Sequence, residues 1–289
     1  GPRVKALACG TWPLTNPPEG AAPLHVGNPI RDAAREAMAT PYAPPSPEGA
    51  LNLLVFGGSQ GASVFSRLVP EAVEALPEPL RARLSLTQQA RPEEVDGLAA
   101  RYEAAGIRAE VAPFFLDMPA RIAAAQLVVA RAGASSVAEL TAIGRPSILV
   151  AYPSAMDDHQ TANARYLADR GAAVLMPQKE LDAEQLANTL TTYMNNPEQL
   201  QQMAQRAREQ ATPNATAAIM VMIVRSPTQR DLGRKPMVIW MGGVCLATRL
   251  CLYLRCKERP AAQWPSPSCM TDTPTRCQPA ARRLILWCR

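Results

Sequence analysis

Short apolar runs alternate with longer amphipathic stretches along the middle of the chain. The apolar runs are continuous, which is typical of strands buried on both faces of a sheet. Six strands are predicted, at residues 51–56, 84–87, 109–113, 127–130, 147–151 and 173–176. Helices are predicted near residues 62–76, 92–105, 117–125, 135–143 and 160–169, with two more within 182–211. This alternation predicts an α/β domain over residues 51–224 with a doubly wound parallel sheet.

The predicted sheet also indicates where a ligand would bind. In doubly wound folds, ligands lie beyond the carboxyl ends of the strands, where the N-termini of the following helices point. Three segments at such strand ends combine small and polar residues: 56–62, 131–139 and 152–163. These segments are therefore the candidates for a functional site.

The two flanks of the domain differ from it in composition. Residues 1–50 are rich in proline and glycine, which break long elements, and we interpret them as a linker-like remnant of an interdomain region. Residues 225–289 hold 12 of the 30 Lys and Arg residues but 3 of the 25 Asp and Glu residues. The rest of the chain is therefore net acidic. The overall charge of +5 gives no reason to expect a nucleic-acid partner.

Cysteine follows the same division. Only Cys9 precedes the 225–289 tail, which holds the other six of the seven cysteines. A domain nearly free of cysteine is typical of a reducing compartment, and the chain starts without a signal-peptide pattern, so we expect a cytoplasmic location. The tail has neither a C-x-x-C pair nor a histidine, and we expect no zinc site there.

The tail also contains an apolar stretch, residues 237–254, about as long as the ~18 residues that suggest a membrane span. Arg249 and the pair Gly242 and Gly243 argue against a span. We expect the tail to be disordered, and a shifted reading frame would explain its abrupt change of composition. Reading the DNA in the other frames tests this explanation.

The sequence FGGSQGA at residues 56–62 follows a predicted strand and opens a predicted helix. Glycines allow a tight turn and a close approach of the main chain to a ligand, and the free amides of a helix N-terminus favour phosphate. The segment matches neither G-x-G-x-x-G nor a Walker A motif. A phosphate site is predicted, without a standard dinucleotide or ATP motif.

The same segment contains G-x-S-x-G, the pattern of a hydrolase nucleophile elbow, with Ser59 as the nucleophile. Asp117, Asp157 or Asp158 and then His159 follow in the order that such a triad requires. However, a single strand-length run precedes Ser59, which leaves no earlier strand and loop to provide a second oxyanion amide. A serine hydrolase is the weaker alternative, and an ordinary strand-to-helix turn is another.

The sequence RAGASSVAE at residues 131–139 again joins a strand to a helix. The small residues Ala134, Ser135 and Ser136 leave the helix N-terminus open to a diphosphate. Glu139, one turn further, can accept hydrogen bonds from both hydroxyls of a ribose. A serine-capped helix with Glu139 as the acid of a capping box fits this segment equally well.

Two further segments carry polar side chains. The sequence YPSAMDDHQTAN at residues 152–163 includes His159 and Gln160, and its donors and acceptors suit the hydroxyls of a hexose. A capped surface turn is equally compatible, and a metal site would need more ligands. The sequence GNPIR at 27–31 places Arg31 where its guanidinium fork could bind a phosphate, although a turn with a solvated arginine fits as well.

Together, these four segments in this order resemble the MurG family of glycosyltransferases. The resemblance covers residues 24–220. It implies a Rossmann-like α/β domain that forms the C-terminal half of a two-domain GT-B glycosyltransferase.

The resemblance also implies which residues bind the substrate. The uracil lies near Phe115, the diphosphate is held by the loop at Ser59 and the helix after Gly133, the ribose by Glu139, and the sugar by Gln160. The full implied set of substrate-binding residues is Arg31, Ser59, Gln60, Phe115, Ala134, Ser135, Ser136, Glu139, His159 and Gln160.

The implied reaction is the inverting transfer of N-acetylglucosamine from UDP-N-acetylglucosamine to the lipid-linked muramyl-pentapeptide of peptidoglycan synthesis. The resemblance implies no cofactor and no metal ion, and it places the complete enzyme at the cytoplasmic face of the inner membrane. The family's N-terminal domain, with its proposed catalytic histidine and its acceptor and membrane surfaces, is not recognisable in residues 1–26. No catalytic residue is therefore identified, and we expect donor binding with little transfer. A noncatalytic UDP-sugar-binding module, or another UDP-sugar enzyme of this fold such as an epimerase, is a further alternative.

Overall fold

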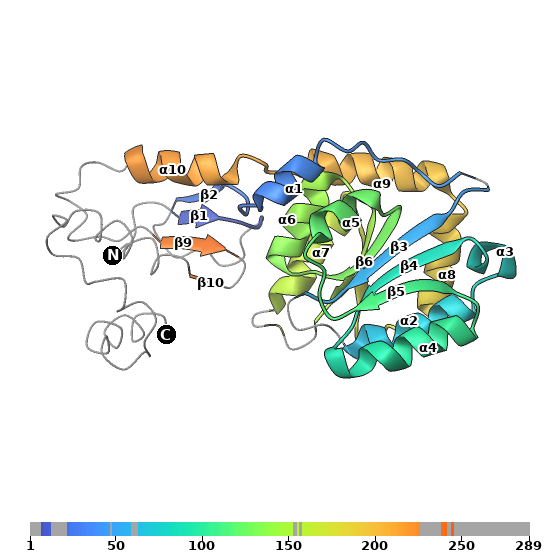
Figure 1. Cartoon of the computed structure of the whole chain (residues 1–289). Helices are drawn as coiled ribbons and strands as arrows, with labels where there is room; N and C mark the ends of the chain where they lie inside the picture. Colours follow the sequence, from blue (N-terminus) through green and yellow to red (C-terminus); the bar gives the residue numbers. More distant parts are fainter. Residues whose placement is uncertain are drawn as a thin grey trace, which may run out of the picture.

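The main body of the protein is a six-stranded parallel sheet in the order β5-β4-β3-β6-β7-β8 (Figure 1). The structure is a computed structural model that describes residues 7–12, 22–46, 48–58, 63–152, 155, 158–225, 238–241 and 244–245. The strands of this sheet are β3 Leu51–Phe56, β4 Leu84–Gln89, β5 Arg108–Ala112, β6 Leu127–Arg131, β7 Ser147–Ala151 and β8 Val174–Pro177. The six predicted strands and the doubly wound parallel sheet are confirmed.

Helices cover both faces of the sheet, because each connection between parallel strands must cross one face or the other. One face carries α2 Ser63–Glu74, α4 Val95–Ala104 and α8 Ala183–Met194. The other carries α1 Asp32–Ala37, α5 Met118–Ala124, α6 Ala134–Ile143 and α7 His159–Ala168, with α9 Pro197–Glu209 packed against α6 and α8. The short helices α3 Glu78–Arg81 and η1 Pro92–Glu94 complete this body.

The continuous apolar runs are explained by two cores, one on each face of the sheet. In β3, Leu53 and Val55 belong to the core under α2, α4 and α8, whereas Leu54 and Phe56 belong to the core under α1, α5, α6 and α7. Successive side chains of a strand point to opposite faces, so a strand that serves both cores has no polar face.

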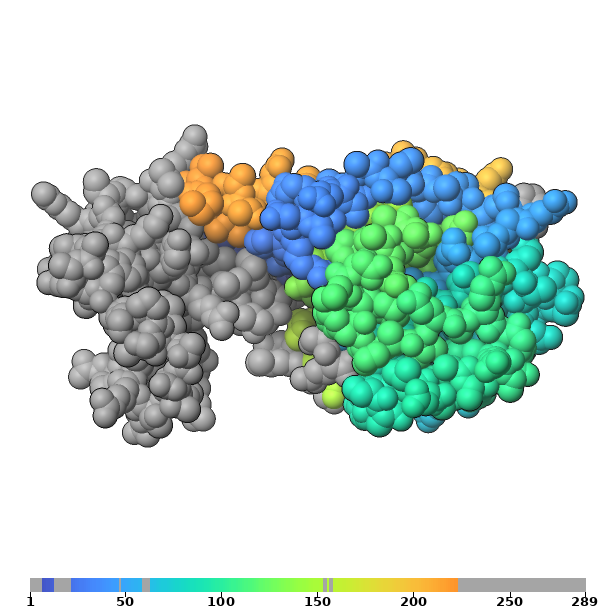
Figure 2. Space-filling view, viewed as in Figure 1, coloured from blue at the N-terminus to red at the C-terminus, as the bar shows by residue number. Residues whose placement is uncertain are grey.

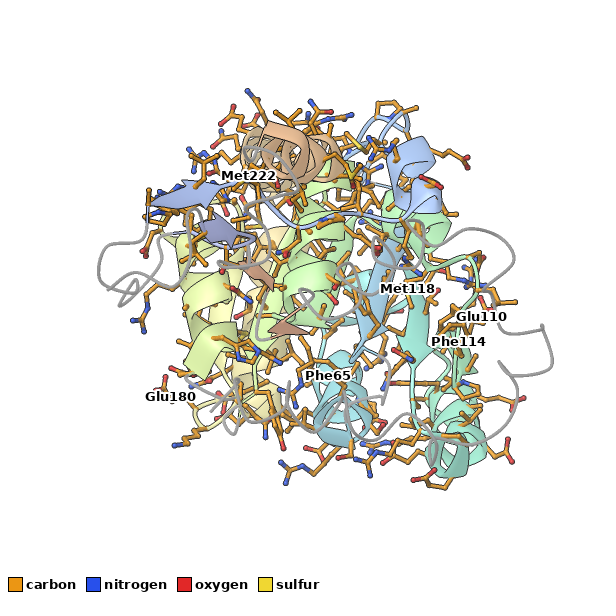
Figure 3. The ribbon with its side chains drawn as sticks, turned by 90° about the vertical axis from the view of Figure 1, so that its left-hand side faces the viewer. Phe65, Glu110, Phe114, Met118, Glu180 and Met222 are labelled. Carbon is orange, nitrogen blue, oxygen red and sulfur yellow. The ribbon has the colours of Figure 1, made fainter. Side chains whose placement is uncertain are left out.

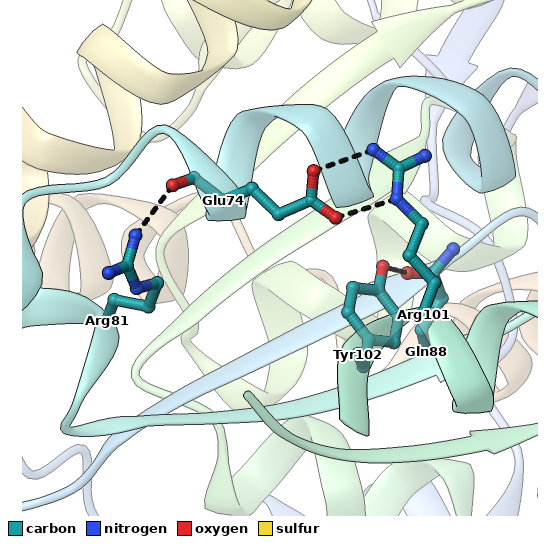
Figure 4. Close-up of polar contacts among 5 residues, drawn as sticks. All are labelled: Glu74, Arg81, Gln88, Arg101 and Tyr102. Carbon is teal, nitrogen blue, oxygen red and sulfur yellow. Dashed lines mark hydrogen bonds and ion pairs between the residues drawn. The ribbon is translucent and has the colours of Figure 1, made fainter. Parts of the chain in front are cut away.

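Buried and exposed polar contacts join α2, α4 and β4 on the first face (Figure 4). The hydroxyl of Tyr102 donates to Gln88 Oε1 at 2.5 Å inside the core. At the surface, Arg101 makes a two-pronged ion pair with Glu74, at 2.6 and 2.7 Å. Arg81 donates to the main-chain carbonyl of Glu74 at 2.9 Å. These bonds hold α3 and α4 against the end of α2.

A second, four-stranded sheet has the order β10-β9-β1-β2. Its strands are β1 Leu7–Cys9, β2 Pro23–His25, β9 Val238–Met241 and β10 Val244–Cys245. Helix α10, Ala215–Arg225, packs on this sheet, with Ile219 against Ala8 and Val26. Figure 2 shows α10 in orange beside the blue N-terminal residues. Strands β1 and β2 and helix α1 lie within the range 1–50 that we interpreted as linker-like. Most of the 225–289 tail lies outside the described residues.

Within the described ranges, no helix is both long enough and apolar enough to cross a membrane. The apolar stretch 237–254 lies mostly outside those ranges.

The largest completely buried side chain is that of Arg145, which follows the C-terminus of α6. Its guanidinium donates to the carbonyl of Ala123 at 2.6 Å, to that of Ile143 at 2.8 Å and to that of Thr40 at 3.1 Å. Burial lowers the pKa of Arg145 to about 10, so the group still carries its charge at neutral pH. The C-terminal carbonyls of α5 and α6 are thus bonded by one cation, which suits the negative ends of their dipoles.

Replacing Arg145 with lysine should destabilise the protein by about 2–4 kcal/mol, because an ammonium group lacks the planar fork and leaves buried carbonyls unpaired. Urea denaturation measures the change in the free energy of unfolding. The matched control is Arg165→Lys, on the exposed side of α7, which should change stability by less than about 0.5 kcal/mol. Equal effects of the two substitutions would contradict the clamp role of Arg145.

Candidate functional site

The order of the sheet strands creates a switch point between β3 and β6. From β3 the chain proceeds to β4 and β5 on one side, and it then crosses to β6 on the other side. The two strands pair in parallel, with Phe56 opposite Ala130, so the loops that follow them leave the sheet side by side. Such a crevice at the carboxyl ends of the central strands is the usual ligand position in doubly wound folds.

The loop after β3 turns in a left-handed conformation. Gly58 has a φ of +86°, and a Cβ atom placed there would meet nothing within 4 Å. The glycine is therefore required by its backbone angle, and the space beside it is open. Ser59 and Gln60, the predicted phosphate-binding residues of this loop, lie outside the described residues.

The loop after β6 leads into an uncapped helix N-terminus. Gly133 is the N-cap of α6 and provides no side-chain hydrogen bond. Among the described residues, the N–H groups of Ala134, Ser135 and Ser136 have no main-chain or side-chain acceptor. The alternative of a serine-capped helix with a capping box is wrong, because the cap is glycine. Free amides and the helix dipole favour an anion at such an end.

Glu139 lies one turn further along α6 and is buried, with 7% of its surface exposed. The guanidinium of Arg31 donates to both of its carboxylate oxygens, from Nε to Oε1 and from Nη2 to Oε2, each at 2.7 Å. The hydrogen-bonded carboxylate raises the pKa of Arg31. The structure thus brings together two predicted site residues that are 108 positions apart in the sequence.

The third predicted segment supports the same loops. The buried amide of Asn163, on α7, donates to the carbonyl of Ala132 at 3.0 Å and so fixes the turn between β6 and α6. Gln160 accepts a hydrogen bond from the main-chain N–H of Tyr152 at 3.1 Å. His159, the first residue of α7, is half-buried beside them. Gln160 and His159 therefore lie at the carboxyl end of β7, next to the switch point.

Arg131 is a site residue for which no role was predicted from the sequence. It is the last residue of β6, and its guanidinium lies 5.3 Å from the ring centroids of both Phe65, on α2, and Tyr152. Burial lowers its pKa. No carboxylate of the described residues pairs with it, so it adds positive charge at the same edge of the sheet. A charged residue that ends a continuous apolar strand was the signal in the sequence.

The turn after β5 presents Phe114, whose side chain is 60% exposed (Figure 3). Phe115, the predicted uracil-binding residue, is 4% exposed, and the guanidinium of Arg121 lies 4.2 Å from its ring centroid. Its ring therefore has no free face for a base. The main-chain N–H and C=O of Phe115 have no hydrogen-bond partner among the described residues and are the groups that can face a ligand.

In the part of the chain that the structure describes, no group of three or more His, Cys, Asp or Glu side chains is placed to hold a metal ion. The groups that the described residues place at the site are main-chain amides, the Arg31 and Arg131 guanidinium groups and the carboxylate of Glu139.

The fold and the site define a doubly wound α/β domain whose central switch point combines an uncapped helix N-terminus with a buried carboxylate. Residues 52–219 match the model of the glycosyltransferase family 28 C-terminal domain, and the chain belongs to this family. Its α/β sheet is the one expected for the C-terminal half of a GT-B glycosyltransferase, so this prediction is confirmed.

Two curated relatives carry the name UDP-N-acetylglucosamine--N-acetylmuramyl-(pentapeptide) pyrophosphoryl-undecaprenol N-acetylglucosamine transferase. The protein of Rhizobium meliloti (strain 1021) is 49% identical over 221 residues, and that of Sinorhizobium medicae (strain WSM419) is 50% identical over 221 residues. Each alignment covers 76% of this chain and 59% of the relative. The chain therefore spans less than two thirds of the length of these relatives.

A solved structure agrees with these relatives. The crystal structure of Acinetobacter baumannii MurG is 32% identical and superposes with a TM-score of 0.63, covering 76% of this chain and 60% of the other. Neither the family match nor these relatives support the serine hydrolase alternative.

Replacing Asn163 with alanine should loosen the turn into α6, because the buried carbonyl of Ala132 loses its donor. We expect a loss of about 1–3 kcal/mol in stability. We also expect faster amide hydrogen exchange at residues 137–140, the first amides of α6 that have main-chain acceptors. The control is Asn188→Ala, at an exposed position of α8, which should change neither measurement. Unchanged exchange in the Asn163 variant would show that this side chain does not position the helix N-terminus.

Proposed function

We propose that this chain is the donor-binding half of an inverting N-acetylglucosamine transferase and that UDP-N-acetylglucosamine binds at the switch point of the sheet. The observation that carries the proposal is the uncapped N-terminus of α6 beside the Gly58 loop, with Glu139 buried on the same helix. Glu139 follows Ala134 by five residues, about 7.5 Å along the helix axis. This spacing suits a ribose whose diphosphate lies at the helix end.

Each part of the donor has a complementary group at this site. The diphosphate would bind the amides of residues 134–136 and the loop that begins at Gly58, where Ser59 and Gln60 follow. The ribose would bind Glu139, and the uracil edge would meet the main-chain N–H and C=O of Phe115. Gln160 and His159, at the end of β7, would face the sugar.

The same groups would assist the reaction by stabilising the leaving group. In the inverting transfer, the acceptor hydroxyl attacks the anomeric carbon as the bond to UDP breaks, and the diphosphate gains negative charge. Fixed amides and guanidinium groups stabilise that charge more strongly in the transition state than in the ground state, and this difference is what lowers the barrier.

The acceptor of the complete enzyme would be a lipid-linked muramyl-pentapeptide, which is the acceptor given in the names of the relatives. In a two-domain GT-B transferase the second substrate binds across the interdomain cleft, and the other half of the enzyme would provide the acceptor site, the base and the contact with the cytoplasmic face of the inner membrane. The product would serve peptidoglycan synthesis, and through it cell shape and division.

Calorimetric titration of the purified chain tests donor binding. UDP-N-acetylglucosamine should bind more tightly than UDP-glucose, and UDP alone should bind measurably. Glu139→Ala should weaken UDP binding about 10- to 100-fold, because two charge-assisted hydrogen bonds to the ribose are lost. Glu36→Ala, on the exposed side of α1, is the control and should leave the dissociation constant unchanged. Equal affinity for the two nucleotide sugars would favour a noncatalytic UDP-sugar-binding module.

Transfer by this chain alone should be at least about 10⁵-fold slower than transfer by a complete enzyme, because correct placement of the acceptor contributes about 7–11 kcal/mol to lowering a barrier. The assay combines the chain with UDP-N-acetylglucosamine and the lipid-linked acceptor and measures product by chromatography. Turnover near that of a full-length relative would overturn the assignment of the acceptor site to a separate half.

A further inference from the structure

The Arg31–Glu139 ion pair joins two residues that are predicted to bind different parts of the donor. The sequence predicts that Arg31 binds a phosphate, and the proposed function assigns Glu139 to the ribose, yet here the guanidinium of Arg31 donates to both carboxylate oxygens of Glu139 at 2.7 Å. The two side chains differ in burial, because 55% of the Arg31 side chain is exposed and 9% of the Glu139 side chain. A nucleotide that binds both groups therefore competes with this pairing.

A complete nucleotide that separates the pair offers a new hydrogen-bond partner to each of the two side chains. Its diphosphate offers the guanidinium a bidentate acceptor, and its ribose offers the carboxylate two hydroxyl donors. A nucleoside compensates Glu139 alone and leaves Arg31 without its partner. A free diphosphate compensates Arg31 alone and leaves a buried carboxylate unpaired, which is the more costly outcome.

The surrounding structure allows the guanidinium to move while its helix stays in place. Arg31 precedes α1 in an extended conformation, with ψ of 154°, and among the described residues its side chain bonds to Glu139 alone. Helix α1 is held by other contacts, since Ala34 and Ala37 lie in the core and Arg35 donates to the carbonyl of Pro213 at 3.2 Å. The ion pair can therefore open without unpacking α1.

We infer that the Arg31–Glu139 pair is a specificity-determining exchange contact that makes ribose recognition depend on a diphosphate in the same ligand. The inference rests on the proposed function, which assigns Glu139 to the ribose, and it adds Arg31 as a ligand of the diphosphate. The site thereby selects nucleoside diphosphates over nucleosides and over free diphosphate.

The test measures the dissociation constants of three ligands, uridine, inorganic pyrophosphate and UDP. Each is measured with the wild-type chain and with two variants. Arg31→Met removes the partner of Glu139, so uridine should bind about five- to tenfold more tightly. This factor is expected if the ion pair of the wild-type chain is closed for about nine-tenths of the time, because only the open fraction can bind the ribose. Glu139→Gln frees Arg31, so pyrophosphate should bind more tightly by a similar factor. Both variants should bind UDP more weakly than the wild-type chain does, because UDP loses one of its two contacts.

Two controls separate this exchange from simpler effects. Arg35→Met removes a positive charge one turn further along α1 without touching Glu139, and it should leave uridine binding unchanged. Arg31→Lys keeps the charge but loses the fork, and it should give an intermediate affinity for uridine. Circular dichroism and thermal unfolding check that each variant is folded, and Arg31→Lys replaces Arg31→Met if the methionine variant is not.

The outcomes distinguish the inference from the proposed function. If uridine binds more weakly to Arg31→Met than to the wild-type chain while UDP still binds the wild type, the pair is a preorganised part of the site and the exchange is overturned. If UDP does not bind the wild-type chain at all, the proposed function itself fails. Tighter uridine binding to Arg31→Met, with weaker UDP binding, supports both.

Discussion

The parallel pairing of β3 with β6 is the constraint on which the site depends. Since Phe56 lies opposite Ala130, strands β3 and β6 end at the same level of the sheet. Helix α2 then packs on one face and α6 on the other, so the connections that follow β3 and β6 lead to opposite faces of the sheet. A shift of one residue in this pairing would move the buried side chains to the wrong core, and the two cores therefore fix the position of the anion site.

The main-chain groups of helix α6 are hydrogen-bonded at its C-terminus but not at its N-terminus. Its C-terminal carbonyls are bonded by the buried guanidinium of Arg145, and Gly144 adopts a left-handed φ of 71° that ends the helix. At the N-terminus, the turn is held by Asn163 while the first amides have no acceptor among the described residues. Buried polar groups are normally paired. The free amides are thus confined to the end that lies at the switch point, where a ligand would complete their bonding.

Local pattern was sufficient to predict the elements of the main sheet but not the contacts between distant side chains. Strands β3 and β7 begin and end where the apolar runs do, because each run serves both cores. Helix α1 has six residues among prolines and gave no periodic signal. The placement of Arg31 on Glu139 depends on tertiary packing across 108 positions, and no local pattern encodes it. Likewise, the two adjacent rings at 114 and 115 look alike in sequence, and only the packing of α5 decides which is buried.

The ion pair also shows why the segment before β3 belongs physically to the proposed donor site. The family match begins at residue 52, yet Glu139 obtains its charged partner from Arg31, and the core over α6 includes Ala34 and Ala37 of α1. A domain that began at residue 52 would contain a buried carboxylate without a cation, which costs several kcal/mol. The segment at 22–50 therefore provides the cation that offsets the burial of Glu139 on α6.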